Sequence, residues 1–391
     1  MPRWSWPLVF TLVLVRPVSG QFQEVQIAVH HGTPITSATA MSSRGAMRIQ
    51  ADGRMVGELG PNDGLRLSLV NGKITARSLS GSWSAERTFT LVPRDPAGGV
   101  RLKGTVPAIG ERNYPGAMEV RRTKAGTLSF VSEPPLEEYV AGVVQSEAGN
   151  DKAIEYYKLQ AVSCRTYALA NARKHAEDGF ELCDQVHCQV YHGKSSNGAI
   201  TDAARATRGM VVVDADIRLI HATFHSNCGG ETLNAEDVWS KEEPYLRATV
   251  DTFCVAQPHA TWMRTMKIKD WLTYLSDKYG VPVRDTAVTG ALLNYEPRCR
   301  DLYLNAKEPL VPLTRVRHDL GLKSTYFRIR PDGEQVVFHG RGFGHGVGLC
   351  QEGAMEMARQ GRTFTDILHH YYANVHLVDL SMLDFFRDDA Q

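Results

Sequence analysis

The feature that most constrains the fold is a change of hydrophobic period at Pro134-Pro135. Before it, short runs such as VQIAVHH and RTFTLVP alternate apolar with polar residues between Gly, Pro, Asn and Asp, a pattern typical of β-strands joined by turns. After it, apolar residues recur three and four positions apart, which predicts an amphipathic helix. Helix and strand patterns then mix without regular β–α–β alternation, so the sequence predicts an α+β fold with a β-rich N-terminal layer.

The prolines also divide the chain into a β-rich module over residues 21–131 and one mixed helix and sheet domain over residues 132–380. The module should contain hairpins such as TKAGTLS. The expected helices of the second part cover 136–147, 152–175, 268–279, 351–360 and 364–372, and its expected strands cover 210–214, 219–226 and 335–340. The second helix has a face of small residues that should be buried against other helices: Ala153, Tyr157, Ala161, Cys164 and Ala168.

Composition limits the classes of function. Hydrophobic residues make up 43% and charged residues 22% of the chain, which are ordinary values for a globular protein. The formal net charge is +1 and no basic run or nucleic-acid-binding motif is present, so we expect no nucleic-acid partner. The glycine-rich segment is not followed by the Gly-Lys-Ser/Thr of a phosphate loop, and no organic cofactor is expected.

Residues 1–20 have the layout of a secretory signal peptide. Arg3 precedes an apolar stretch of about ten residues, which is followed by the small residues Ser19 and Gly20. We therefore expect an exported protein, located in the periplasm, in the cell wall or outside the cell, whose mature chain begins near Gln21. Arg16 interrupts the apolar stretch, so an uncleaved signal segment is the alternative and would be the only attachment to a membrane.

One acid lies on the apolar face of the first expected helix. The apolar stripe of that helix reaches Glu147 in its next turn, just before Gly149-Asn150, and consists of Leu136, Tyr139, Val140, Val143 and Val144. An apolar face and the negative end of a helix dipole both raise the pKa of a carboxyl group, which suits a general acid. A side chain that escapes to solvent is the alternative. No second carboxylate lies at a helical offset, so a two-carboxylate glycosidase is not indicated.

Two later segments are candidates for binding a ligand. HSNCGGETLNAEDVW, residues 225–239, combines a Gly-Gly turn with many polar groups beside Trp239, which suits a sugar, although a capped surface turn would look the same. GRGFGHGVGLCQEGA, residues 340–354, has glycine at every second position up to Gly348, so an extended strand would present one face of bare backbone. A purely structural ribbon and a Cys–His nucleophile pair formed by His345 and Cys350 are the alternatives.

Seven cysteines in a chain that we expect to be exported indicate disulfides or a metal site. Cys183, His187 and Cys188 lie within six residues, with His175 eight positions before Cys183 and His192 four positions after Cys188. Two thiolates and two imidazoles suit a tetrahedral zinc ion, and a Cys183–Cys188 disulfide is the alternative.

Taken together, these segments resemble the SpoIID/LytB family of bacterial cell-wall proteins. LEEYVAGVVQSEAGN and YYKLQAVSCRTYALANARKH are similar to the opening motif and the helix motif of that family, and HSNCGGET and GFGHGVGLCQEGA are similar to its later motifs. The resemblance covers residues 116–377. It implies a lytic transglycosylase that cleaves peptidoglycan glycan strands. In the best-understood branch of the family, the substrate is a strand already stripped of peptide. Glu147 corresponds to the catalytic acid, which also deprotonates the 6-hydroxyl that closes a 1,6-anhydro ring.

The resemblance implies further site residues. Some members carry zinc through a set that corresponds to His175, Cys183, His187 and Cys188, so we expect one structural zinc. Substrate binding is expected from residues of the helix motif and of the two later motifs, namely Arg165, Tyr167, His225, Ser226, Asn234, Arg341 and His345. The other branch of the family was named for enhancing amidases. A non-catalytic protein that binds the wall and a cell-wall amidase is therefore the alternative, and a Cys–His hydrolase is the third hypothesis.

The departures from the family indicate disulfides. The family commonly has Ser at the positions of Cys228 and Cys350, and the two motifs should meet around one cleft, so we expect these two cysteines to pair. Cys254 and Cys299 are expected to form a second pair. Cys164 would then remain a buried free thiol on its helix.

Overall fold

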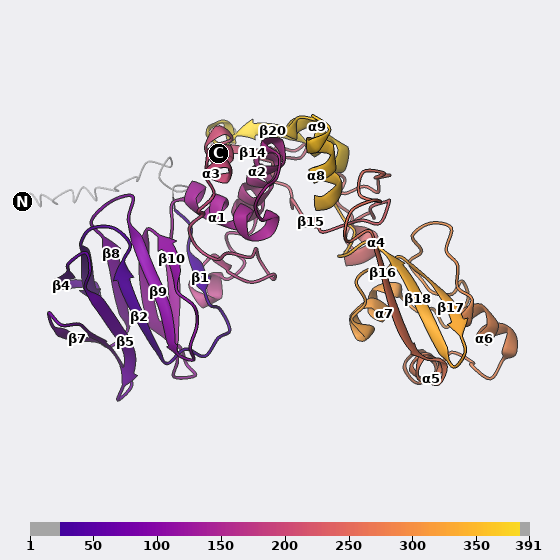
Figure 1. Ribbon diagram of the computed structural model, residues 1–391, viewed down its shortest axis with the longest axis horizontal. Helices are drawn as coiled ribbons and strands as arrows, with labels where there is room; N and C mark the ends of the chain where they lie inside the picture. The colour runs from indigo at the N-terminus through magenta and orange to yellow at the C-terminus, as the bar shows by residue number, and fades with distance from the viewer. Residues whose placement is uncertain (1–23, 384–391) are drawn as a thin grey trace, which may run out of the picture.

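The computed structural model describes residues 24–383 and combines helices with several separate sheets, which confirms the expected α+β class. The chain forms three units in a row (Figure 1): two packed sheets at the N-terminal end, a helical centre, and a small sheet covered by helices. The expected signal peptide, residues 1–20, lies outside the described residues. Between residues 24 and 383, no helix is long and apolar enough to cross a membrane.

The N-terminal unit is built from two sheets whose buried faces share one core. Its strands are β1 (Ile27–Val29), β2 (Ser37–Ser42), β3 (Met47–Ala51), β4 (Arg54–Leu59), β5 (Gly64–Val70), β6 (Lys73–Arg77), β7 (Ser82–Ala85), β8 (Thr88–Pro93), β9 (Gly99–Val106), β10 (Arg112–Pro115), β11 (Ala117–Arg122) and β12 (Leu128–Glu133). One sheet has the order β13-β1-β12-β11-β8-β3-β4, in which β13 is Leu182–Cys183, and the other has the order β10-β9-β2-β5-β6-β7. Alternate side chains of strands such as β3 are buried, because successive residues of a strand point to opposite faces. The expected TKAGTLS hairpin joins β11 to β12.

A strand from the second half of the chain extends the N-terminal sheet. β13 (Leu182–Cys183) runs parallel to β1, with Cys183 opposite Ala28. The carboxylate of Asp184 accepts hydrogen bonds from the backbone N–H groups of His30 at 2.6 Å and His31 at 3.1 Å. The N-terminal unit therefore supports the segment that carries three of the four expected zinc ligands, Cys183, His187 and Cys188.

The helical centre is built around α2 (Ile154–Ala170), which other elements cover on several sides. α1 (Leu136–Ala148), α3 (Gly198–Ala206), α8 (Gln351–Arg359), α9 (Phe364–Tyr371) and β14 (Met210–Val213) pack against it, and β14 pairs with β20 (His376–Asp379). Ala161, Cys164 and Ala168 are buried as expected, whereas Ala153 is exposed just before the helix begins. Small side chains on this face allow the neighbouring helices to approach closely.

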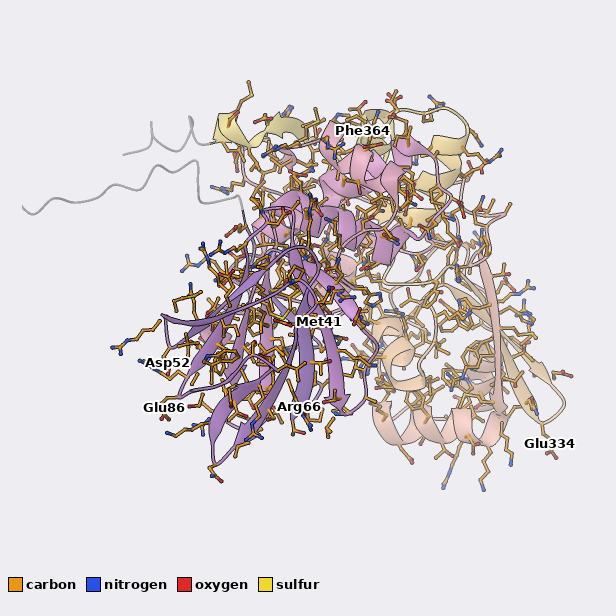
Figure 2. All side chains as sticks on the ribbon, turned by 60° about the vertical axis from the view of Figure 1, so that its left-hand side comes forward. Met41, Asp52, Arg66, Glu86, Glu334 and Phe364 are labelled. Carbon is orange, nitrogen blue, oxygen red and sulfur yellow. The ribbon has the colours of Figure 1, made fainter. Side chains whose placement is uncertain are left out.

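The third unit has a hydrophobic core of its own. β16 (Thr261–Lys267), β17 (Phe327–Asp332) and β18 (Gln335–Arg341) form its sheet, and α5 (Ile268–Tyr279), α6 (Thr286–Leu293) and α7 (Leu313–Leu320) accompany it. Its core, which includes Trp271 and Phe338, is separate from the core of the other two units. In Figure 2, Glu334 at the β17–β18 turn lies at the far end of this unit from Phe364 of the centre. The sequence predicted α5 and β18 but did not distinguish this separate core.

A short pair of strands joins the two motifs that contain glycine. β15 (Phe224–His225) pairs in parallel with β19 (Leu349–Cys350), and isolated bridges link Asn227 to Phe343 and Leu233 to Val347. The expected strand over 219–226 is therefore regular only at its end. α4 (Glu236–Trp239) follows on the same side of this pair.

Candidate active site

The helical centre carries a cleft of about 310 Å³ that brings Glu147 together with both glycine-containing motifs. Its walls come from α1, α2, the loop after β13, β15, α7 and the glycine-rich segment. The lining residues are Glu147, Tyr167, Val186, Cys188, Gln189, Ala222, Thr223, Phe224, His225, Ser226, Arg317, Phe343, Gly344, His345 and Gln351. In the described chain, residues 24–383, Glu147 is the only carboxylate of this lining.

Glu147 lies in the last turn of α1 and is half-buried. The backbone N–H of Val190 donates a hydrogen bond to its Oε1 at 2.9 Å. Burial raises the pKa of the Glu147 carboxyl, and the hydrogen bond from Val190 offsets part of this rise because it stabilises the carboxylate. A carboxyl group with a raised pKa keeps its proton closer to neutral pH, as a general acid must.

His225 lines the cleft with a free ring nitrogen. Its Nδ1 donates a hydrogen bond to the carbonyl oxygen of Val347 at 3.2 Å, so Nε2 carries the lone pair of the neutral ring. Nε2 is buried, and no described residue forms a hydrogen bond with it. Burial is the main reason that the pKa of His225 is far below its usual value. The neutral ring therefore keeps one buried acceptor nitrogen without a described partner at the wall of the cleft.

His345 uses both of its ring nitrogens within the protein. The backbone N–H of Val347 donates to Nδ1 at 3.1 Å, and Nε2 donates to the carbonyl oxygen of Phe224 at 3.0 Å. Burial lowers the pKa of His345 to about 4, so the ring is neutral. These bonds fasten the glycine-rich segment to β15. His345 therefore has no nitrogen left to activate Cys350, and the Cys–His nucleophile pair is not formed.

The glycine-rich segment is not the extended ribbon that the sequence predicted. The glycines at 342, 344, 346 and 348 all have positive φ, which turns the chain at every second residue. A Cβ on Gly348 would lie 2.5 Å from the carbonyl oxygen of Thr223, and a Cβ on Gly344 would lie 2.7 Å from Cβ of His225. The glycines thus allow this segment to pack closely on β15, and of these four only Gly344 lines the cleft.

Of the residues predicted to bind substrate, four line the cleft, namely Tyr167, His225, Ser226 and His345, and the others lie elsewhere. The side chain of Asn234 accepts a hydrogen bond from the backbone N–H of Ala248 at 2.9 Å and donates one to Asp237 at 2.9 Å, so it holds its own loop. Arg341 donates to the hydroxyl of Tyr326 at 3.1 Å and lines a separate cavity beside β16 and β18. The sequence did not show that the side chains of Asn234 and Arg341 point away from the cleft.

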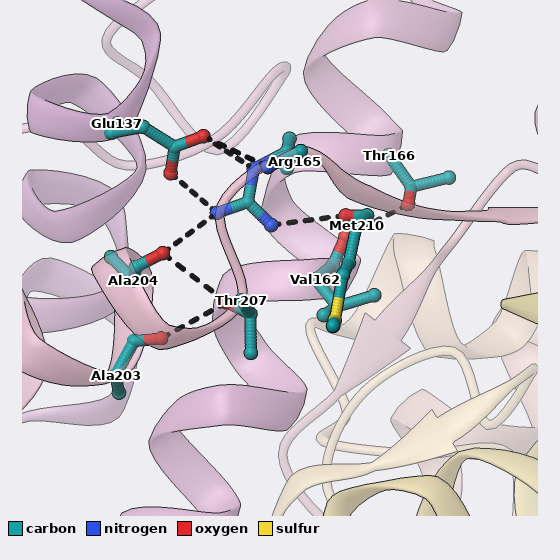
Figure 3. A network of polar contacts seen from close by, with 9 residues as sticks. Glu137, Val162, Arg165, Thr166, Ala203, Ala204, Thr207 and Met210 are labelled. Carbon is teal, nitrogen blue, oxygen red and sulfur yellow. Dashed lines mark hydrogen bonds and ion pairs between the residues drawn. The ribbon is translucent and has the colours of Figure 1, made fainter. Parts of the chain in front are cut away.

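Arg165 is also absent from the cleft lining, because its guanidinium is fully buried inside the helical centre (Figure 3). Its Nε and Nη2 bind the two carboxylate oxygens of Glu137 in α1, at 3.0 and 2.5 Å. Its Nη1 and Nη2 donate to the carbonyl oxygens of Met210 at 3.0 Å and Ala204 at 3.2 Å. The predicted substrate-binding role is therefore wrong, and Arg165 ties α1, α2, α3 and β14 together.

The sequence did not predict several residues that line the cleft. Gln189 and Gln351 directly follow cysteines of the predicted motifs, so their positions in the sequence were a usable signal. Arg317 belongs to α7 of the third unit, and only the packing of that unit on the centre brings it to the cleft. Nothing in the local sequence around Arg317 indicated this.

His175, Cys183, His187 and Cys188 come together as predicted, with their ligand atoms within 4.8 Å of one another. Sγ of Cys188 lies 3.5 Å from Nε2 of His175 and 3.7 Å from Nδ1 of His187, and Sγ of Cys183 lies 3.9 Å from that Nδ1. In a tetrahedral zinc site with Zn–S of about 2.3 Å and Zn–N of about 2.0–2.1 Å, sulfur and nitrogen are about 3.5–3.6 Å apart. The donor set and its spacing therefore fit zinc.

The surroundings of this cluster also suit a metal. Nδ1 of His175 lies 3.1 Å from a carboxylate oxygen of Asp178, in the 3₁₀ helix η2 (Ala176–Asp178), and this leaves Nε2 to face Cys188. Carboxylates orient metal-binding histidines in the same way. Two residues after Cys188, the backbone N–H of Val190 holds Glu147. The cluster thus anchors the loop that positions the acid.

The predicted disulfides are absent, because all seven cysteines are free. Cys228 does lie near Cys350, but Sγ of Cys254 joins them and lies 3.3 Å from Sγ of Cys228. Cys299 is exposed and outside this cluster, so the predicted Cys254–Cys299 pair is wrong. Sequence spacing did not indicate that the loop before β16 returns Cys254 to the two motifs. Cys164 is buried and free, as predicted.

Fold and site define a protein with one half-buried acid in a cleft beside a cluster of two His and two Cys side chains. A family model described as Stage II sporulation protein matches residues 124–213. Stage II sporulation protein D of Bacillus amyloliquefaciens is 32% identical over 302 residues, which cover 73% of this chain and 83% of that protein. The protein of the same name from Bacillus subtilis (strain 168) is 31% identical over 260 residues, which cover 62% of this chain and 74% of that protein. The amidase enhancer of Bacillus subtilis (strain 168) is 26% identical over 281 residues, which cover 59% of this chain and 39% of that protein.

The chain belongs to the SpoIID/LytB family, as its motifs predicted. The matched segment, residues 124–213, includes Glu147 and all four residues of the cluster at His175. Membership supports a role connected with the cell wall.

Proposed function

We propose that the protein cleaves peptidoglycan glycan strands as a lytic transglycosylase, with Glu147 as general acid and general base. The observation that carries the proposal is a cleft whose lining, within residues 24–383, includes Glu147 and no other acid. Glycosidases that use water or a covalent intermediate commonly need two carboxylates. A transglycosylase uses a hydroxyl of its own substrate as the nucleophile, so one carboxyl group suffices.

Glu147 acts twice in this mechanism. Its protonated carboxyl first gives a proton to the glycosidic oxygen while the bond from that oxygen to the anomeric carbon breaks. The carboxylate then removes the proton of the 6-hydroxyl on the same sugar, and the 6-oxygen bonds to the anomeric carbon. The product is a 1,6-anhydro sugar, no water is consumed, and Glu147 is protonated again. Burial favours the acid form for the first step, and the Val190 N–H stabilises the carboxylate for the second.

The rest of the cleft offers groups that suit a sugar. Nε2 of His225 accepts a hydrogen bond from a hydroxyl, and Arg317 supplies donors. Trp239 is 47% exposed, and its ring centre lies 5.1 Å from that of His345 in the lining, so it offers an apolar face for stacking. We take strands already stripped of peptide as the substrate.

We further propose one structural zinc at His175, Cys183, His187 and Cys188. The ion would offset the charge of two thiolates and crosslink the segments on either side of η2. We assign the bond cleavage to Glu147, and the cluster supports it through the loop whose Val190 N–H donates to Glu147.

We propose export as the route to the wall, on the basis of residues 1–20. N-terminal sequencing of the protein from its exporting host should find a first residue near Gln21. Finding Met1 or Pro2 instead would contradict the proposal.

A second candidate function is non-catalytic. The similarity to a protein named amidase enhancer supports it. In that case the cleft would bind glycan strands without cleaving them, and the protein would stimulate a cell-wall amidase.

The test compares Glu147→Gln with Glu138→Gln on purified peptide-free glycan strands. Both changes replace a carboxyl by an amide on α1, but Glu138 is 37% exposed, lies outside the cleft and pairs with Lys194 at 3.4 Å. Cleavage by Glu147→Gln should fall at least about 10²–10⁴-fold, while Glu138→Gln stays close to wild type.

Mass spectrometry of the products separates the mechanisms. The wild type should release chains ending in a 1,6-anhydro sugar, which is one water lighter than a hydrolysed end. Hydrolysed ends would show that water attacks and that a second carboxylate takes part. A wild type that cleaves nothing but accelerates a purified amidase would favour the enhancer function.

A further inference from the structure

A second group of metal-ligand side chains lies behind the cleft wall, apart from the cluster at His175. Cys228 follows β15, Asp251 and Cys254 belong to the loop before β16, and Cys350 ends β19 at the start of α8. All four side chains are buried, and their ligand atoms lie within 4.8 Å of one another. Three separate segments of the chain therefore bring three thiols and one carboxyl group to a single point.

The distances in this group suit a tetrahedral ion better than a covalent bond. Sγ of Cys228 lies 3.3 Å from Sγ of Cys254 and 3.3 Å from Oδ2 of Asp251. A disulfide would place two sulfurs about 2.05 Å apart. Zinc bonds of about 2.3 Å to sulfur and about 2.0–2.2 Å to oxygen give tetrahedral edges of about 3.8 Å and about 3.5 Å. The side chains need to move by only a few tenths of an ångström.

Neighbouring groups orient these side chains as they do in metal sites. The hydroxyl of Tyr371 donates to Oδ2 of Asp251 at 2.9 Å, and the backbone N–H of Phe253 donates to Oδ1 at 2.9 Å. The backbone N–H groups of Cys228 and Gly353 point at Sγ of Cys350, at 3.2 and 3.4 Å. Cys350 is also the N-cap of α8, whose dipole favours a thiolate. N–H groups and carboxylate orientation of this kind are typical of the outer shell of a metal site.

The donor set itself indicates which ion fits. Three thiols and one carboxyl group are buried with their ligand atoms within 4.8 Å of one another. Cysteine sulfur and aspartate oxygen are both common ligands of zinc. Thiolate ligands select zinc over magnesium or calcium.

We propose that Cys228, Asp251, Cys254 and Cys350 form a second structural zinc site. His225 and Ser226 of the cleft lie just before Cys228 in the sequence, and Gln351 lies just after Cys350. The ion would crosslink these wall segments to the loop that leads into the third unit. The site is independent of the proposed catalytic function.

The test is a zinc count on the full mature chain, purified under reducing conditions and measured by inductively coupled plasma mass spectrometry. The wild type should hold two zinc ions per chain. Cys228→Ser and Asp251→Asn should each lower the count by one, and Cys183→Ser should remove the other ion. Cys164→Ser is the matched control, because Cys164 is a buried thiol outside both clusters, and it should keep both ions.

Cobalt substitution gives an independent measurement. Cys183→Ser protein loaded with cobalt(II) should keep a sulfur-to-cobalt charge-transfer band from the second site, and the band should disappear when Cys228→Ser is added. If Cys228→Ser does not fold, the wild-type count and the band in Cys183→Ser still decide.

The outcomes separate the two sites. If the wild type holds one zinc ion per chain and Cys183→Ser still holds one, the ion belongs to the second site. That result would support the proposal although the cluster at His175 would then hold no zinc. A zinc count that no substitution in the second cluster changes would overturn the proposal. So would a Cys228–Cys254 disulfide found by non-reducing peptide mapping of the native protein.

Discussion

Replacing Arg165 by alanine should weaken the folded state and leave the chemistry of the cleft alone. Arg165 was expected to bind substrate, but it is fully buried and contacts three other elements of the centre. Arg165→Ala removes a bidentate ion pair with Glu137 and leaves the carbonyl oxygens of Ala204 and Met210 without this donor (Figure 3).

The size of the effect follows from these contacts. Breaking a buried ion pair by removing one partner costs about 3–5 kcal/mol. An unsatisfied buried acceptor costs about 1–3 kcal/mol. The side chain of Glu137 is 25% exposed, so water can reach its carboxylate and relieve part of the loss. We therefore expect the free energy of unfolding to fall by about 3–5 kcal/mol in total, a large share of the roughly 5–15 kcal/mol of a typical domain.

The assay is urea unfolding followed by circular dichroism, with glycan binding measured on the same preparations. Arg205→Ala is the control, because Arg205 lies on the neighbouring helix α3 and forms an exposed pair with Asp202 at 3.1 Å. That pair is 72% and 70% exposed, so its loss should cost less than about 1 kcal/mol. A double variant with Met at 165 and Leu at 137 should recover part of the stability, because it also removes the stranded carboxylate.

One result would refute this assignment. If Arg165→Ala were as stable as Arg205→Ala but bound glycan much more weakly, Arg165 would be a binding residue after all.

The remaining predictions concern the acid, the glycine-rich segment and the metal cluster. Burial raises the pKa of Glu147 above its unfolded value of about 4.3. Between the unfolded and the folded pKa, the folded state binds more protons than the unfolded state, so the free energy of unfolding should fall as the pH rises through this range. In Glu147→Gln, the urea midpoint should lack this part of its pH dependence, whereas Glu138→Gln should keep it. Identical pH profiles for the two variants would refute the raised pKa of Glu147. Gly348→Ala should lose about 1–3 kcal/mol more than Gly280→Ala in thermal unfolding, because the two φ values are +69° and +68° but only Gly348 lacks room for a Cβ. Equal losses would show that Thr223 can move aside. Chelating zinc should lower glycan cleavage and restored zinc should recover it, because the loop from Cys188 carries the Val190 N–H that holds Glu147; a metal-free protein with full activity would contradict this coupling.

Local patterns predicted the elements that depend on neighbours in sequence. The helix expected over 268–279 is α5 (Ile268–Tyr279), and the apolar stripe before Glu147 is buried in α1. The side-chain period of a helix or strand follows from local geometry, so the sequence carries it directly. The four residues from His175 to Cys188 were also predictable, because they lie close together in the chain.

Contacts between distant segments were not predictable in the same way. Arg341 and Asn234 belong to motifs near the cleft, yet their side chains bond within their own surroundings. Arg317 reaches the cleft from a unit whose separate core left no local signal. Alternate glycines matched an extended strand, but Gly342, Gly344, Gly346 and Gly348 have positive φ, and the close packing on Thr223 and His225 leaves no room for a Cβ at Gly348 or Gly344.

The sequence by itself determined the succession of strands and helices, the acid at the end of α1 and the compact set of His and Cys side chains from His175 to Cys188, since each depends on spacing along the chain. The tertiary structure alone decided that Arg165 is a buried crosslink, and that Cys254 joins Cys228 and Cys350 while Cys299 stays exposed. The physical reason is that burial and side-chain partners depend on which distant segments pack together. That packing is set by the whole core and not by any one stretch of residues.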